Sequence, residues 1–200
     1  MAEKPSQSAA RPLVLASTSR YRRVLLQRLG IAFEIAGPAT DETRLVDEPP
    51  HATAARLALA KARVVAVRHP QAIVIGSDQV CALGQTAVGK PGSVDENRLM
   101  IGQLSGQTAV FHTAVAVIGI EAGVWKQHVD QTHCVFRELS PAEIDDYVER
   151  EPCLDCAGGF KVEGLGISLF QRIESLDPTA LIGLPLIWLA GALRESGLRS

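Results

Sequence analysis

Short, wholly apolar runs alternate with longer amphipathic stretches along the chain. The runs LVLA at 13–16 and AIVIG at 72–76 contain no polar side chain, which is typical of strands buried on both faces of a sheet. Where apolar positions recur three or four residues apart between capping residues, the pattern predicts helices. The predicted helices cover residues 20–29, 51–68, 96–105, 141–150 and 185–197.

The second half of the chain predicts further strands. Two alternating segments, 108–120 and 124–139, are separated by the turn residues Glu121, Ala122 and Gly123 and predict a long antiparallel hairpin. A final strand is predicted over 166–175. Because the other strands alternate with helices, we expect an α/β fold with a mixed sheet covered by helices on both faces.

The composition is that of an ordinary globular chain. With 46% hydrophobic and 21% charged residues among 200, the sequence predicts one domain over 12–198 after a flexible tail at 1–11. The net charge of -2 argues against nucleic-acid binding. The apolar stretch 181–193 is too short and too interrupted to cross a membrane. Four cysteines and the lack of a signal-peptide pattern predict a cytoplasmic location.

The stretch LASTSRYRR at 15–23 combines a strand end, hydroxyl residues and a helix start. Cations such as Arg22 and Arg23 in the first turn oppose the helix dipole unless an anion lies nearby. A Ser/Thr-rich turn at a helix N-terminus, together with arginine, makes a phosphate cradle. The alternative is that the long arginine side chains reach into water.

Carboxylates occur in two short stretches, after the run 72–76 and in DET at 41–43. Asp78, between Ser77 and Gln79, comes directly after the run 72–76, where we expect the carboxyl end of a buried strand and hence a ligand site. Asp78 could hold a divalent metal or activate water, although Ser-Asp is also a common turn. If the fold brings Glu42 close to it, the pair would suit Mg²⁺ or Mn²⁺.

Two lysines and a cysteine pair leave alternatives open. Lys61 lies on the apolar face of its helix, so it either extends to the edge or points into an anion pocket. The stretch GQTAVGKP at 84–91 nearly matches a P-loop, but the final Pro lacks the hydroxyl and the N–H. Lys90 can still contact phosphate as a point charge. Cys153 and Cys156 form a C-x-x-C pair, but neither a second zinc half-site nor a following helix supports a zinc or redox function.

Six motifs in order carry a resemblance to a known family. LASTSRYRRVLLQRLG, DET, LALAKA, IGSDQV, GKP and AGGFKVEGLG together resemble the Maf family of nucleoside triphosphate pyrophosphatases over about 13–193. The resemblance implies an elongated mixed-sheet α/β fold with a nucleotide cleft, like that of inosine triphosphate pyrophosphatase. It also implies hydrolysis between the α and β phosphates, with a divalent metal cation and a nucleoside triphosphate substrate.

The resemblance also assigns roles to individual residues. It implies Asp78 as proton acceptor, and Glu42 and Asp78 as metal ligands. The other residues to which it gives a catalytic or phosphate-binding role are Ser17, Ser19, Arg22, Lys61 and Lys90.

Three positions are associated with selection of the base, and they resemble the 7-methyl-GTP branch of the family. Gln79 stands where the dTTP and UTP branch usually has Thr. The ring of Tyr21 can attract a cationic methylated guanine face-on, and Glu163 can accept hydrogen bonds from its N1–H and amino group. The alternatives are a dTTP or UTP pyrophosphatase of the same family, or a non-catalytic nucleotide-binding regulator of septation. The sequence does not give the oligomeric state, and a homodimer is one of the alternatives.

Overall fold

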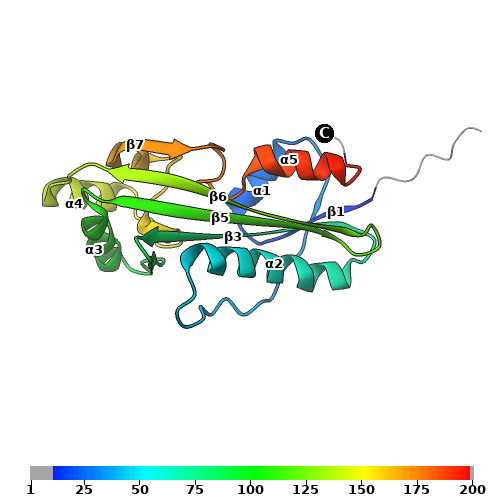
Figure 1. The fold of residues 1–200 in the computed structure, drawn as a ribbon. Coiled ribbons are helices and arrows are strands. Elements are labelled where there is room, and N and C mark those ends of the chain that lie inside the picture. Colours follow the sequence, from blue (N-terminus) through cyan, green and yellow to red (C-terminus); the bar gives the residue numbers. More distant parts are fainter. Residues whose placement is uncertain (1–10, 199–200) are drawn as a thin grey trace, which may run out of the picture.

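The protein is built around one twisted sheet (Figure 1). The structure, a computed structural model, describes residues 11–198, so all but the last residue of the predicted tail at 1–11 lies outside the described residues. The strands are β1 Leu13–Ala16, β2 Glu34–Ile35, β3 Ile73–Leu83, β4 Thr86–Val88, β5 Thr108–Gly119, β6 Val124–Phe136 and β7 Phe170–Ser175.

The sheet is mixed, as expected from the sequence. Its strand order is β2-β1-β3-β5-β6-β7, with β4 paired to β3. Strands β2, β1 and β3 run parallel, whereas β5, β6 and β7 continue the sheet in antiparallel fashion. The predicted long hairpin is confirmed as β5 and β6, although β6 ends at Phe136 rather than at Leu139.

Helices cover both faces of the sheet (Figure 1). They are α1 Arg20–Gln27, α2 Pro50–Arg68, α3 Val94–Leu104, α4 Pro141–Arg150 and α5 Leu186–Glu195, with short 3-10 helices at Ala157–Gly159 and Leu165–Leu169. Leu15 and Ile75 pack with α1 and α5, whereas their neighbours Val14 and Val74 pack against α2. The runs 13–16 and 72–76 are therefore buried on both sides, as their composition predicts.

The end of β3 was predicted wrongly. The strand does not stop at Gly76 but continues to Leu83, because its second half pairs with β5. Asp78 therefore lies within a strand rather than beyond its carboxyl end. The strand that does end here is β1, whose last residue Ala16 pairs with Gly76. The turn after β1 thus meets the middle of β3, and this meeting point creates the recess that holds the site.

The predicted strand at 166–175 was also wrong in its first part. Residues Leu165–Leu169 form a 3-10 helix, and β7 begins only at Phe170. Strand pairing to β6 runs from Phe170 to Ser175, so hydrogen bonds to the sheet decide where extended structure begins. The short strands β2 and β4 were not predicted.

Gly76 brings α2 onto the sheet. A Cβ atom at this position would lie 2.3 Å from the carbonyl oxygen of Ala58 and 2.6 Å from the backbone nitrogen of Ala62. Only a residue without a side chain allows so close an approach. As a result the backbone of α2 rests directly on β3, and Lys61 on this helix comes within reach of Asp78.

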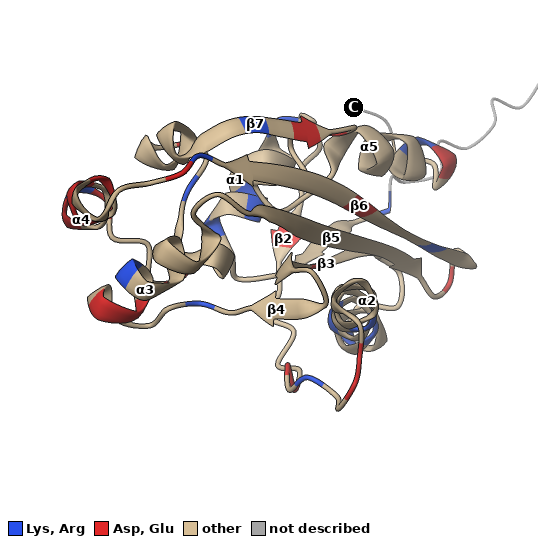
Figure 2. Ribbon diagram, turned by 60° about the vertical axis from the view of Figure 1, so that its left-hand side comes forward, with Lys and Arg blue, Asp and Glu red and all other residues tan. Residues whose placement is uncertain are grey.

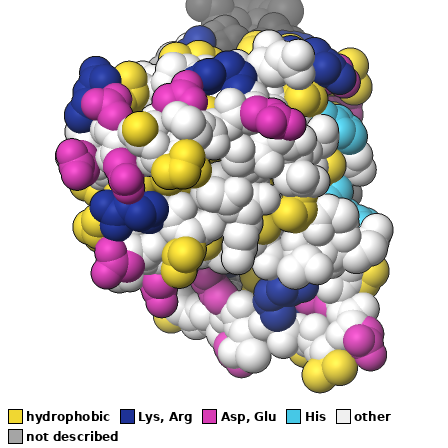
Figure 3. Space-filling model, turned by 90° about the vertical axis from the view of Figure 1, so that its left-hand side faces the viewer, with side chains coloured by type: hydrophobic (Ala, Val, Ile, Leu, Met, Phe, Trp, Pro, Cys, Tyr) yellow, Lys and Arg dark blue, Asp and Glu magenta, His cyan; other side chains and the backbone are white. Residues whose placement is uncertain are grey.

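Charged residues are sparse along the central strands and more frequent on the helices and loops (Figure 2). On the end of the molecule that Figure 3 shows, acidic and basic side chains are interspersed among the described residues and do not form a basic patch. Within residues 11–198, no helix has the length and apolar character needed to span a bilayer.

Candidate active site

A cleft of about 840 Å³ opens where β1 ends beside β3. Its wall is formed by the turn into α1, the loop at 37–44, α2, β3, the turn after β4, and segments at 155–163 and 181–183. The structure brings all the sequence-predicted site residues to this cleft: Ser17, Ser19, Tyr21, Arg22, Glu42, Lys61, Asp78, Gln79, Lys90 and Glu163. Arg23, by contrast, is exposed and does not line the cleft.

Lys61 is the centre of the charged cluster. Its Nζ lies 2.6 Å from Asp78 Oδ1 and 2.7 Å from Glu42 Oε1. The side chains of Lys61 and Asp78 are only 6% and 10% exposed, whereas Glu42 reaches in from the solvent side with 57% of its side chain exposed. Of the two interpretations of Lys61, the structure supports the one in which it points into a pocket.

The electrostatics of Glu42 follow from this arrangement. Partial burial alone would raise the pKa of its carboxyl group, but the hydrogen bond and charge of Lys61, together with Lys90 and Arg22, lower the pKa overall. Glu42 is therefore ionised at neutral pH. A carboxylate that is half open to solvent and ionised is available to a cation that enters the cleft.

Arg22 is fixed on the wall opposite Lys61. Its Nε donates a hydrogen bond to the carbonyl oxygen of Gly183 at 3.0 Å, and its Nη1 donates to Ser17 Oγ at 3.4 Å. The hydroxyl of Ser77 donates to the same carbonyl at 3.0 Å. Burial lowers the pKa of Arg22, while Asp78 and Glu42 oppose that effect. Arg22 thus does not simply extend into water but presents its charge inside the cleft.

The turn at 17–19, which consists of hydroxyl residues, caps the start of α1. Ser19 caps the helix by accepting a hydrogen bond from the backbone N–H of Arg22 at 3.4 Å, and Ser17 Oγ accepts one from the N–H of Ser19 at 3.2 Å. The first turn of α1 contains no acidic residue. Its positive end therefore faces the cleft without a carboxylate from its own first turn, an arrangement suited to phosphate.

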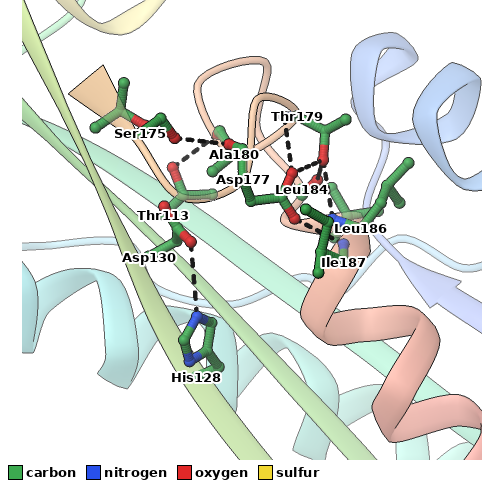
Figure 4. Close-up of polar contacts among 11 residues, drawn as sticks. Thr113, His128, Asp130, Ser175, Asp177, Thr179, Ala180, Leu184, Leu186 and Ile187 are labelled. Atoms are coloured by element: carbon green, nitrogen blue, oxygen red, sulfur yellow. Dashed lines mark hydrogen bonds and ion pairs between the residues drawn. The ribbon is translucent and has the colours of Figure 1, made fainter. Parts of the chain in front are cut away.

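The loop between β7 and α5 holds the carbonyl that orients Arg22, and Figure 4 shows how Asp177 and Thr179 fasten this loop. Asp177 Oδ1 accepts hydrogen bonds from the N–H and hydroxyl of Thr179 at 2.8 and 2.6 Å. Its Oδ2 accepts a hydrogen bond from the N–H of Ile187 at 2.7 Å, at the start of α5. Asp177 is 3% exposed, so this carboxylate ties the loop to the helix and fixes Gly183. Neither Asp177 nor Gly183 was predicted as a site residue.

The residues associated with the base, Tyr21, Gln79 and Glu163, line the same cleft, and the part of the cleft that they line is called its base end below. The guanidinium of Arg20 lies 4.8 Å from the ring centroid of Tyr21 and donates a hydrogen bond to its hydroxyl at 2.7 Å. Gln79 Nε2 donates to Thr113 Oγ1 and to the carbonyl oxygen of Ala180, at 2.9 and 3.1 Å. The amide oxygen of Gln79 is then the atom that remains for a ligand in the cleft.

Several further residues line the cleft at this end and were not predicted. Lys161, Asp155 and Cys156 all face it. Burial alone would lower the pKa of Lys161, but the neighbouring Cys153 and Tyr21 raise it overall. The motif AGGFKVEGLG contains Lys161 and was used only for Glu163, so the signal for a second residue was present.

The two weak motifs of the sequence have ordinary structures. The near match to a P-loop at 84–91 covers a turn and β4 rather than a loop that opens a helix, so it is not a P-loop. The C-x-x-C pair is followed by a 3-10 turn and not by an α-helix. Cys153, Asp155 and Cys156 place their sulfur and oxygen atoms within 4.8 Å of one another, which is one ligand fewer than a structural zinc site requires.

The fold and the sequence both have known relatives. The structure of the Ham1 protein of Staphylococcus aureus superposes with a TM-score of 0.52 at 13% identity, covering 94% of this chain and 100% of that one. At this identity the similarity shows a shared fold. The family model described as "Maf-like protein" matches residues 12–196. The chain therefore belongs to the Maf-like family.

Relatives at about half identity share one name. A protein of Xanthomonas oryzae pv. oryzae named 7-methyl-GTP pyrophosphatase is 54% identical over 185 residues, which are 92% of this chain and 96% of that protein. Proteins of the same name from Aromatoleum aromaticum and Cupriavidus metallidurans are 53% and 51% identical, over 93% and 95% of this chain and 96% of each relative. The family predicted from the motifs is confirmed.

Proposed function

We propose that the protein hydrolyses 7-methyl-GTP between the α and β phosphates, giving the monophosphate and pyrophosphate. The observation that carries this proposal is the buried Asp78, bonded to Lys61 in the same cleft as Arg22. A carboxylate among cations can accept a proton from water while the cations bind the polyphosphate. The shared name of the relatives supports the choice of reaction and substrate.

The donor set of the cleft fits a divalent cation. Oxygens of Glu42 and Asp78 already converge on one positive group, the Lys61 ammonium. Each carboxylate has a second oxygen that makes no hydrogen bond with another described residue. Carboxylate oxygens are the ligands that Mg²⁺ and Mn²⁺ prefer, and such an ion bound by Glu42 and Asp78 would neutralise phosphate charge.

The phosphates have their partners on three sides. Arg22 presents its charge from one wall and Lys61 from α2, while Lys90 lies exposed on the turn after β4. Ser17 and Ser19 add hydroxyls and the open start of α1. We propose that these groups bind the triphosphate and offset the charge that builds up on it during hydrolysis, where most catalysis of phosphoryl-type transfer lies. Asp78 takes the proton of the attacking water.

The base end of the cleft holds the base. Tyr21 offers a half-buried ring beside the cleft, and Gln79 offers its amide oxygen. Glu163 lies exposed at the mouth, where its carboxylate can accept hydrogen bonds from guanine N1–H and the amino group. Uracil and thymine offer a single such donor. We propose that these three side chains select the methylated guanine.

The test is release of pyrophosphate from a panel of nucleotides. The purified chain is given 7-methyl-GTP, GTP, dTTP and UTP, each with and without Mg²⁺ or Mn²⁺, and kcat/KM is compared. We expect 7-methyl-GTP to be hydrolysed most efficiently and only with metal. A preference for dTTP or UTP would identify the other branch of the family. Binding without any pyrophosphate release would instead favour a nucleotide-binding regulator.

Two more general proposals accompany this function. The continuous sheet supports a single domain over 12–198, and all the cysteines are free, which supports a cytoplasmic location. A homodimer remains a prediction that the mass of the protein in solution would test.

A further inference from the structure

A pair of cysteines lies beside the base end of the cleft and has no part in the proposed reaction. The sulfur atoms of Cys153 and Cys156 lie within 4.8 Å of each other. Cys153 is fully buried, whereas Cys156 is partly exposed and lines the cleft. A disulfide requires sulfur atoms about 2.05 Å apart, so the pair must approach before a bond can form.

The side chain that can move is Cys156. The backbone N–H of Cys153 donates a hydrogen bond to Asn97 Oδ1 at 3.1 Å, and Asn97 Nδ2 donates to the carbonyl oxygen of Gly159 at 2.8 Å. Asn97 is fully buried on α3, so it holds the Cys153 end of the segment firmly. The contact of Cys156 Sγ with the hydroxyl of Tyr21 is long, at 3.9 Å. Closing the pair would therefore move the sulfur atom that now contacts Tyr21.

The same segment is bonded to the turn that carries Lys90. The carbonyl oxygen of Leu154 accepts a hydrogen bond from the N–H of Gly92 at 3.3 Å, and the N–H of Gly158 donates to the carbonyl oxygen of Gly89 at 3.1 Å. These two hydrogen bonds lie on either side of Lys90 in the sequence. A change in the backbone between the cysteines is thus transmitted directly to both the base end and the phosphate end of the cleft.

We propose that Cys153 and Cys156 are a modification site, in which hydrogen peroxide oxidises the two thiols to an intramolecular disulfide that lowers nucleotide turnover. The Cys156 sulfur attacks one peroxide oxygen, forms a sulfenic acid and releases the other oxygen as water. The Cys153 sulfur then attacks the Cys156 sulfur, loses its proton and displaces a second water. Two thiols and one peroxide thus give one disulfide and two waters, and the sulfurs supply both electrons.

The environments of the two thiols agree with this order of attack. The nearby thiol of Cys153 lowers the pKa of Cys156, although burial and Asp155 oppose this effect. The same contact and burial raise the pKa of Cys153. The more accessible thiol is therefore also the one that ionises first, and the thiolate is the nucleophile. The cysteines Cys81 and Cys134, in contrast, are fully buried and do not line the cleft.

The first measurement follows the bond itself. The reduced, chelator-treated full chain is exposed to hydrogen peroxide, unfolded and alkylated, and its intact mass and peptides are recorded. We expect a loss of the mass of two hydrogens and alkylation of Cys81 and Cys134 alone. Kinetics of 7-methyl-GTP hydrolysis should show kcat/KM reduced at least about tenfold, because small displacements at reacting groups have large effects on rate. Dithiothreitol should reduce the disulfide and restore the original kcat/KM.

Matched variants separate this effect from general oxidation. Cys153→Ala can still form the sulfenic acid on Cys156 but not the disulfide, so its kcat/KM should fall less than about twofold after peroxide, against the tenfold loss above. If Cys153→Ala has a much lower Tm than the parent chain, Cys153→Ser replaces it as the variant that cannot form the disulfide. Cys81→Ala, another buried cysteine, should still form the bond and lose turnover.

The proposal is overturned if both thiols of the pair remain open to alkylation, or if the disulfide forms while turnover is unchanged. The mass measurement needs no catalysis. If the chain hydrolyses no nucleotide, the proposed function fails, and the affinity of the reduced and oxidised chain for 7-methyl-GTP then decides the effect of the bond.

Discussion

The two ends of the cleft are built in different ways. At the phosphate end, Asp78 lies on the central strand β3 and Lys61 on α2, and both side chains are buried. At the base end, Tyr21 stands at the start of α1, while Glu163 and Cys156 lie on an irregular segment with only short 3-10 turns. The reacting pair at the phosphate end is thus fixed by the packing of regular elements, whereas the base end, apart from Gln79 on β3, is carried by the start of a helix and by loops and turns.

This difference suggests that the residues for phosphate hydrolysis and the residues for choice of nucleotide can be changed separately. Regular elements hold side chains to narrow positions, as the attack on a phosphate requires, whereas loops can vary without disturbing the core. We expect substitutions at the phosphate end to change turnover of every nucleotide. Substitutions at the base end should change the ranking of nucleotides instead.

The largest effect is expected from Asp78→Asn. The amide cannot accept the proton of the attacking water, so kcat/KM should fall about 100- to 10,000-fold for every substrate. The fold should remain, because Asn keeps the shape of the side chain. Pyrophosphate release measures the loss, and Asp95→Asn, on the exposed start of α3, is the control. Turnover close to that of the parent chain would remove Asp78 from its role.

Gly76→Ala should disrupt the phosphate end of the cleft, because it should displace α2 from the sheet. The new methyl group would meet the backbone of α2 at Ala58 and Ala62, and such overpacking costs about 1–3 kcal/mol of unfolding free energy. The shift also separates Lys61 from Asp78, so kcat should fall about tenfold or more. Denaturant unfolding and kinetics test both effects. Gly102→Ala on α3 meets only a side-chain atom at 3.9 Å, so it should leave kcat unchanged and should not destabilise the protein, because Ala favours a helix over Gly by up to about 1 kcal/mol.

Glu163→Gln tests the base end alone. Loss of a charged acceptor for the guanine N–H groups should reduce the preference for 7-methyl-GTP over UTP about 10- to 100-fold, the equivalent of about 1.5–3 kcal/mol. Because the phosphate end is unchanged, kcat for UTP should stay near its original value. Glu149→Gln, exposed on α4, is the matched control. A uniform loss for all nucleotides would contradict the separation of the two ends.

The smallest effect concerns stability and lies outside the cleft. Asp130 is 6% exposed, its Oδ1 has no hydrogen-bond partner among the described residues, and burial and Asp177 raise its pKa. The ionised form is therefore disfavoured in the fold, so this group destabilises the protein as pH rises above the usual carboxyl range of about 4. Asp130→Asn should raise Tm at pH 7 by about 2–4 °C, or about 1 kcal/mol.

The pH dependence supplies the check on that prediction. The gain from Asp130→Asn should vanish in thermal melts recorded below the ordinary pKa of an aspartate, where both the folded and the unfolded chain are protonated. Asp146→Asn, exposed on α4 and paired with Arg150, should show no gain at pH 7. A gain that persisted at low pH would point to packing rather than charge.

The sequence predicted those parts of the fold that local patterns determine. The buried strand β1, the helix α4 with its capping box at Ser140 and Glu143, and the β5–β6 hairpin all formed where expected. The length of β3 could not be predicted, because its polar residues beyond Gly76 are held in a strand by pairing with β5 and not by their own preference. Tertiary pairing overrode the local signal there.

The candidate site shows the same limit. The motifs identified side chains that the fold indeed brings to one cleft, but not what fixes them. Arg22 is oriented by the carbonyl oxygen of Gly183, and a backbone acceptor has no signature in a sequence. The short distance from Lys61 to Asp78 likewise depends on the missing side chain of Gly76. That packing relation becomes visible only when helix and strand are placed together.

The length of β3 restricts how the enzyme can admit its substrate. Strands β3 and β5 pass through both halves of the sheet and are paired without interruption from Val74 to Leu83. The middle of the molecule is therefore held by an unbroken ladder of hydrogen bonds. Bending the sheet there would break the ladder in the middle of the core. We therefore expect any opening or closing of the cleft to involve the segments of its wall outside the sheet, at 37–44 and 155–163.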